Sequence, residues 1–102
     1  MATMIEVARA RDLPAHVVIG VGDVFVFKAV GGVVRAGADL LDVLGPFRPA
    51  VIGPDGTVMS PEGPPGTVMF LARAPGSATI EVISGDPWRR PERIALDIEI
   101  EA

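Results

Sequence analysis

The residues able to perform catalysis are few and stand apart in this sequence. The chain has one histidine, His16, and no cysteine. General acid–base and nucleophilic catalysis both require a reactive group held beside a second group that activates it. No serine lies in a nucleophile motif, and a lone histidine beginning a β-prone run is typical of the surface. The sequence therefore predicts that the protein is not an enzyme.

Two pairs of carboxylates could serve glycoside hydrolysis, which uses two acidic groups. They are Asp39 with Asp42 and Glu99 with Glu101, and their positions are typical of loop starts and of a solvated strand face. The absence of cysteine excludes disulfides and thiolate metal sites, and the sequence around Asp55 lacks the acidic spacing of a calcium loop. We expect no metal and no cofactor.

Two loops carry residues that are typical of protein-binding surfaces. In the first, Pro64 and Pro65 favour a stiff extended conformation that loses little entropy on binding. The second holds Trp88, the only tryptophan, beside arginines, and Trp and Arg are enriched at binding hot spots. With a glycine pair that we place at the same end of the molecule, the predicted partner-binding residues are Gly31, Gly32, Gly63, Pro64, Pro65, Gly66, Pro87, Trp88, Arg89 and Arg90.

An alternative interpretation of the second loop remains open. Large aromatic side chains are usually mostly buried, so Trp88 could fold back as a lid over the end of the core. Arg89 and Arg90 would then pair with Asp86 and Glu92. In that case the protein would be a structural or assembly domain.

The elements that must position these loops are strands. The clearest is residues 93–101, in which Ile94, Leu96, Ile98 and Ile100 share one face by strict alternation. Residues 77–83 alternate in the same way, with Ala78, Ile80 and Val82 inward, whereas residues 67–73 are apolar on both faces and predict a central strand. Because a Pro75-Gly76 turn separates these last two runs, we expect a hairpin whose outer ends bring both loops together.

Further short strands are expected at residues 4–8, 17–19 and 23–28, and a Pro-Asp-Gly turn joins two β-prone runs within residues 51–59. Residues 38–44 are ambiguous, and we favour irregular structure or a strand. Turn signals about every ten residues predict an all-β immunoglobulin-like sandwich of about seven antiparallel strands. Its core should contain Ile80, Val82, Leu96 and Ile98, with Phe25 or Phe27 among them.

Length and charge limit the organisation and the partners. The 102 residues predict one domain spanning residues 1–102, and the net charge of −4 makes nucleic acid an unexpected partner. No apolar run is long enough to span a membrane, and the N-terminus lacks the features of a signal peptide. We therefore expect no membrane partner and a cytoplasmic protein, or a secreted one if a signal segment has been removed.

The C-terminal half resembles a known family. Gly63 to Phe70 reads Gly-x-x-Gly-Thr-Val-Met-Phe, a Pro-Gly-Ser-Ala-Thr-Ile run follows, and then Pro87-Trp88-Arg89 and the alternating final strand. This order is similar to the chagasin-like inhibitors of papain-type cysteine proteases, over residues 63–101 and again near residues 21–28. The resemblance implies an immunoglobulin-like sandwich that binds a protease through three adjacent loops.

The sequence also departs from the pattern of that family. Prolines stand in the glycine-rich loop, and Asp86 stands where the family has the arginine of Arg-Pro-Trp. The Asn-Pro-Thr-Thr-Gly loop is absent, with Gly31-Gly32 nearest to its position. Similar spacings occur in bacterial immunoglobulin-like repeats with structural roles. The sequence thus predicts a protein-binding module of unidentified partner, for which a papain-like protease is one candidate.

Overall fold

A computed structural model describes residues 2–60, 62–63, 65–85 and 89–102. These residues form strands joined by turns, with one short 3-10 helix, so the all-β prediction is confirmed. No helix of the described residues is long enough to cross a membrane. The elements are β1 (Met4–Val7), η1 (Ala10–Asp12), β2 (His16–Gly20), β3 (Val24–Phe27), β4 (Gly31–Ala36), β5 (Leu41–Phe47), β6 (Val51–Ile52), β7 (Val58–Met59), β8 (Thr67–Ala72), β9 (Gly76–Ser84) and β10 (Glu92–Glu101).

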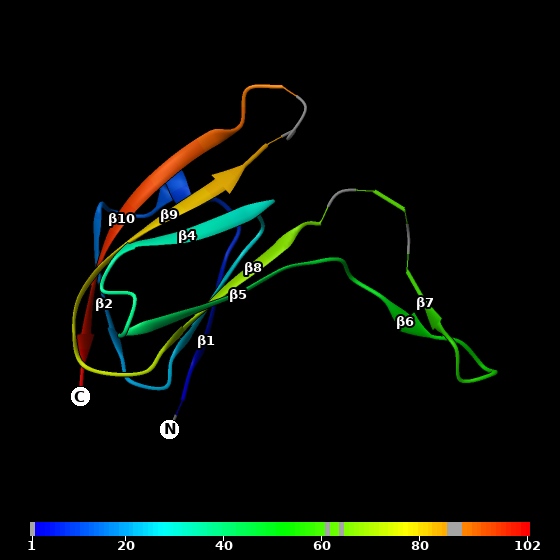
Figure 1. Ribbon diagram of the computed structural model, residues 1–102, viewed down its shortest axis with the longest axis horizontal. Coiled ribbons are helices and arrows are strands. Elements are labelled where there is room, and N and C mark those ends of the chain that lie inside the picture. Colours follow the sequence, from blue (N-terminus) through cyan, green and yellow to red (C-terminus); the bar gives the residue numbers. More distant parts are fainter. Residues whose placement is uncertain (1, 61, 64, 86–88) are drawn as a thin grey trace.

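Two four-stranded sheets pack face to face and form a β-sandwich (Figure 1). The first has the order β1-β3-β8-β5 and the second the order β2-β10-β9-β4, while β6 and β7 form a separate two-stranded ribbon. The immunoglobulin-like sandwich is confirmed, with ten strands in the described residues. The expected count of about seven did not include β4, because its initial glycines are typical of a turn.

The hairpin expected from residues 67–73 and 77–83 is wrong. β8 belongs to the first sheet and β9 to the second, so the turn at Pro75 carries the chain across the sandwich. β9 instead forms an antiparallel hairpin with β10, in which Leu96 lies opposite Ile80. The pairing is also not antiparallel throughout, since β1 pairs with β3 and β2 with β10 in parallel.

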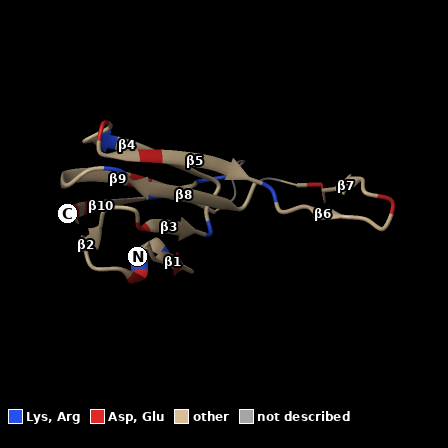
Figure 2. Ribbon diagram, turned by 90° about the horizontal axis from the view of Figure 1, so that it is seen from below, with Lys and Arg blue, Asp and Glu red and all other residues tan. Residues whose placement is uncertain are grey.

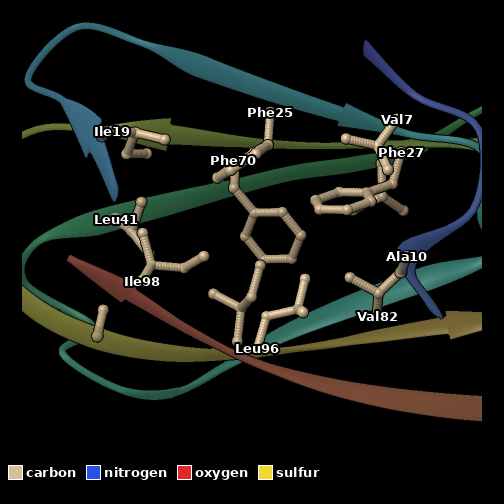
Figure 3. Packing of buried hydrophobic residues seen from close by; sticks show 14 of the residues in the cluster. Val7, Ala10, Ile19, Phe25, Phe27, Leu41, Phe70, Val82, Leu96 and Ile98 are labelled. Carbon is tan, nitrogen blue, oxygen red and sulfur yellow. The ribbon is translucent and has the colours of Figure 1, made fainter. Parts of the chain in front are cut away.

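The predicted core residues lie between the two sheets. Ile80, Leu96 and Ile98 are almost completely buried, as is Val82, and these four come from neighbouring strands of the second sheet. Phe25 and Phe27 both join them from the first sheet, where β8 has the predicted central place. Figure 3 shows the Phe70 ring between the sheets. The rings of Phe70 and Phe27 pack edge to face with their centroids 5.8 Å apart, a favourable aromatic geometry.

Asp23 organises the end of the sandwich that carries both termini. One carboxylate oxygen of Asp23 accepts a hydrogen bond from the Thr3 amide at 3.0 Å, and the other accepts one from the Gly20 amide at 2.8 Å. β10 ends beside Gly20, so the N- and C-terminal strands meet here (Figure 1). The connecting loops described below lie at the opposite end of the sandwich (Figure 1).

Candidate protein-binding loops

Three connecting segments meet at the end opposite the termini. The connection between β3 and β4 is only residues 28–30, and it contacts the segments on either side of it. The Ala29 amide donates a hydrogen bond to the Gly66 carbonyl at 3.1 Å, and the Val30 amide donates to the Ile83 carbonyl at 2.8 Å. Gly66, which precedes β8, and Ile83, near the end of β9, therefore lie at the same end of the molecule, although through facing sheets and not through a hairpin.

Gly31 and Gly32 are the first residues of β4 and not a protruding loop. They pair with Ile83 and Val82 of β9. A Cβ atom on Gly32 would lie 2.6 Å from Cζ of Phe70 and 2.8 Å from Cγ1 of Val68, whereas one on Gly31 would lie 3.6 Å from Ile83. A side chain at position 32 would therefore point into the core, and glycine there lets the sheets approach.

The described part of the first loop is open to solvent. Gly63 and Gly66 are exposed, and Pro65 is half-buried. Gly63 has a φ of +130°, and a Cβ there would meet no atom within 4 Å. The Gly66 amide donates a hydrogen bond to the Phe47 carbonyl at 3.0 Å, which joins this loop to the end of β5. Gly63 and Gly66 therefore leave the backbone on either side of residue 64 open to solvent.

The second loop leaves β9 at Gly85 and returns to β10 at Glu92. Gly85 takes a φ of +95°, and Arg89 and Arg90 are exposed. Three of the predicted binding residues lie outside the described residues, namely Pro64, Pro87 and Trp88, as does Asp86. Glu92, which the alternative interpretation pairs with the loop arginines, lies 3.5 Å from Arg11.

A shallow open pocket of about 230 Å³ lies beneath this second loop. Its floor includes the buried side chain of Val82 and its rim carries three cations, Arg9, Arg11 and Lys28. Among the described residues of the lining, Glu92 is the one acidic side chain. This end of the molecule therefore has a local positive charge although the whole chain is acidic.

No described group of side chains forms a catalytic or metal-binding arrangement. His16 lies 3.5 Å from Glu99 on the exposed face of β2 and β10, and Asp42 pairs with Arg73 at 3.3 Å. Every buried side chain among the described residues is apolar. Within the same residues, no three His, Asp or Glu side chains come together as metal ligands.

The sequence analysis missed an ion-pair cluster on the outer face of the second sheet. Glu81 of β9 lies 3.1 Å from Arg35 of β4 and 2.8 Å from Arg93 of β10. Hydrogen bonds from Arg35 and Arg93 lower the pKa of Glu81 below its ordinary value, and the bond from Arg35 has the larger effect. The alternation in residues 77–83 places Glu81 outward, but Arg35 reaches it through the β4–β9 pairing and Arg93 through the β9–β10 pairing, and the pairing with β4 was not predicted.

Comparison with known proteins adds information at the level of the fold. No protein-family model matches the sequence, and no curated protein matches it. Among solved structures, the cysteine protease inhibitor EhICP2 from Entamoeba histolytica is similar, with a TM-score of 0.60 and 12% identity over 98% of this chain and 97% of that chain. Amebosin is similar with a TM-score of 0.50 and 12% identity over 99% of each chain. The chain thus has the immunoglobulin-like fold of a cysteine protease inhibitor, as the resemblance of its C-terminal half implied.

Proposed function

We propose that the protein is a non-catalytic binding module whose partner is a papain-like cysteine protease. The contact surface is the loop edge, which we define as residues 62–66 and 85–91. The observation that carries the proposal is the pair of hydrogen bonds from Ala29 to Gly66 and from Val30 to Ile83, which place the end of the first loop and the strand that leads into the second at one end of the sandwich. Binding residues on loops that a scaffold fixes lose little conformational entropy when a partner is bound.

Two further features support this proposal. The fold is shared with a cysteine protease inhibitor over nearly the whole chain. The sequence of the loop edge combines prolines with Trp88 and adjacent arginines, and Trp and Arg are enriched at interfaces. The cations around the neighbouring pocket would favour a partner with an acidic rim, because complementary charge speeds association.

In this proposal the β3–β4 connection is not inserted into the cleft of the protease. The β3–β4 connection has three residues, and two of its amides are already bonded to Gly66 and Ile83. This connection is too short to reach beyond its neighbours. The contact is therefore assigned to the two flanking loops, with Trp88 as the anchor.

The test is inhibition of papain by the protein, with Trp88→Ala as the variant. We expect inhibition at micromolar concentration or below, and a loss of about 2 kcal/mol or more of binding energy in the variant, roughly thirtyfold. Thermal stability should be nearly unchanged. Val21→Ala, in the turn at the opposite end of the sandwich, is the matched control and should bind as the wild type does.

Two results would contradict parts of the proposal. A wild-type protein that leaves papain fully active would remove the protease partner. If Trp88→Ala instead lowers the free energy of unfolding by about 3–5 kcal/mol, Trp88 is internal packing, and the structural or assembly reading holds.

A further inference from the structure

The β6–β7 ribbon leaves the sandwich and exposes apolar side chains. We call residues 48–60 the arm; it projects away from both sheets in two perpendicular views (Figures 1 and 2). The radius of gyration of 14.6 Å exceeds the value of about 13 Å typical of 100 residues. Ten large hydrophobic side chains of the described residues are exposed, and seven of them lie on the arm or on adjoining β5: Val43, Leu44, Phe47, Val51, Ile52, Val58 and Met59.

The arm is a defined hairpin with two uncovered faces. Val51 pairs with Met59 and Ile52 with Val58, so each face of the ribbon carries one apolar pair, and these side chains are 55% to 74% exposed. The tip is closed by a hydrogen bond of 2.8 Å from the Gly53 amide to the Thr57 carbonyl. A lone two-stranded ribbon is only marginally stable in water, and a concentration of exposed apolar side chains marks an interaction surface.

The charges of the arm point to what covers it. The chain from Val43 in β5 to Met59 in the arm has two charged residues, Arg48 at the base of the arm and Asp55 at its tip. Figure 2 shows the negative tip at one end of the ribbon and, near the base, a positive segment together with a second negative one; Glu62 follows the arm in the sequence. Arg48 forms no ion pair with any residue that the structure describes. The segment is therefore neutral and has opposite charges at its two ends, whereas the whole chain carries −4.

We propose that the arm pairs with the arm of a second copy of this chain. The two arms lie antiparallel about a twofold axis and bury their apolar side chains against each other. Such an interface is self-complementary: Arg48 meets the partner's Asp55, and Asp55 meets the partner's Arg48. A parallel arrangement would instead bring like charges together, so the charge pattern selects the antiparallel one.

The available apolar area fits a small dimer interface. A large apolar side chain offers roughly 100 Å², and seven that are about half exposed present roughly 400 Å² per copy. Homodimer interfaces are about 65% apolar, so an interface that covers both faces of the ribbon and the exposed part of β5 would bury at most roughly 1,200 Å² in total. That reaches the area of about 1,000 Å² that a specific interface needs. The association assigned to the arm is therefore of moderate strength and depends on concentration.

Sedimentation velocity of the purified protein, from about 1 to about 100 µM, tests the proposal directly. We expect a monomer–dimer equilibrium within this range. The variant Ile52→Thr with Val58→Thr keeps β-branched side chains, and its dimer should dissociate at least about tenfold more readily. Val18→Thr with Val21→Thr is the matched control, because both valines are exposed on the body of the sandwich; its dimer should be unchanged.

A charge exchange tests the antiparallel geometry. Arg48→Asp and Asp55→Arg should each weaken the dimer at low salt by about threefold to tenfold, and the two together should restore it. The loss of the Asp55 contacts to Thr57 is common to Asp55→Arg and the double variant, so their comparison isolates the charge pairing.

Three results would overturn the inference. A wild-type protein that stays monomeric at about 100 µM would assign the arm to a different protein partner. A dimer unaffected by the threonine variant would place the interface elsewhere. A double charge variant no tighter than the single ones would exclude the antiparallel pairing. Circular dichroism of every variant separates these results from misfolding, and none of them depends on protease binding.

Discussion

The two glycines that begin β4 show how differently adjacent residues can be constrained. Gly32 sits over the Phe70 ring in the core, whereas Gly31 has room beside Ile83. A methyl group added at Gly32 would force either the aromatic ring or β4 to move. The lack of space for a Cβ atom at position 32, and not the backbone conformation, explains why glycine is the second residue of β4.

Gly32→Ala should destabilise the protein, because its Cβ would lie 2.6 Å from Phe70. Overpacking of this kind costs about 1–3 kcal/mol of unfolding free energy. Gly31→Ala is the matched control, and its effect should stay within about 0.5 kcal/mol. Urea unfolding measures both. Equal effects of the two substitutions would show that β4 does not lie over Phe70 as described.

Glu81 gives a pH dependence of stability with a defined sign. Its pKa is lowered from the ordinary 4.5, first by the hydrogen bond from Arg35 and then by that from Arg93. The lowered pKa means that the stabilisation is complete above about pH 4.5 and is lost as pH falls through the folded-state pKa. Glu81→Gln should therefore be less stable than the wild type at pH 7, and the difference should shrink in acid.

Chemical denaturation at a series of pH values measures this difference. Glu6→Gln on β1 is the control, since Glu6 forms no ion pair with the residues that the structure describes. A difference for Glu81→Gln that stays constant between neutral pH and pH 3 would contradict the assignment.

At the level of the elements, the positions of the strands could be predicted from the sequence more reliably than which strands pair with each other. Residues 77–83 and 93–101 correspond to β9 and β10, because period-two alternation indicates which face is buried, and residues 67–73, which are apolar on both faces, correspond to the central strand β8. It does not report whether two buried faces lie side by side or across a sandwich. The β8–β9 pairing was therefore wrong, although both strands were placed correctly.

The candidate site was predictable to a similar extent. The loops before β8 and after β9 share one end in either pairing, so their proximity followed from strand direction alone. β4 could not be found from its sequence, because Gly31 and Gly32 favour a turn locally, and the need for glycine at position 32 comes from its packing on Phe70. The same omission hid Arg35, the partner of Glu81 that lies on β4.

Truncation of the core strands tests the contrast between the sandwich and the arm. Ile80→Ala and Leu96→Ala remove fully buried side chains, and each should cost about 2–5 kcal/mol of unfolding free energy. Ile52→Ala in β6 removes a side chain that is largely exposed and should cost less than about 0.5 kcal/mol in dilute monomer. Denaturant unfolding at low protein concentration measures all three. Similar costs for β6 and the core strands would show that the arm packs on the sandwich.

On the scale of the whole molecule, the two ends of the sandwich have separate roles. Asp23 closes the end that carries both termini. The parallel pairings of β1 with β3 and of β2 with β10 contribute to this closure. The opposite end carries the loop edge, and the arm starts beside it where Gly66 bonds to Phe47. The core between them needs no polar group, since every described buried side chain is apolar. The sandwich therefore holds the loops and the arm through an apolar core and strand pairing.

Hydrogen exchange should divide the molecule along the same line. Amides of β8, β9 and β10 lie in central or doubly paired strands over the core, so they should exchange only by global unfolding. The Gly53 amide closes an isolated ribbon and should exchange far faster in dilute protein, because a two-stranded ribbon opens easily. Raising the protein concentration should slow exchange in the arm and leave the core strands unchanged, since dimer formation covers only the arm. Mass-spectrometric exchange at two concentrations measures this, and an arm as protected as β9 in dilute solution would mean that it is held by the sandwich itself.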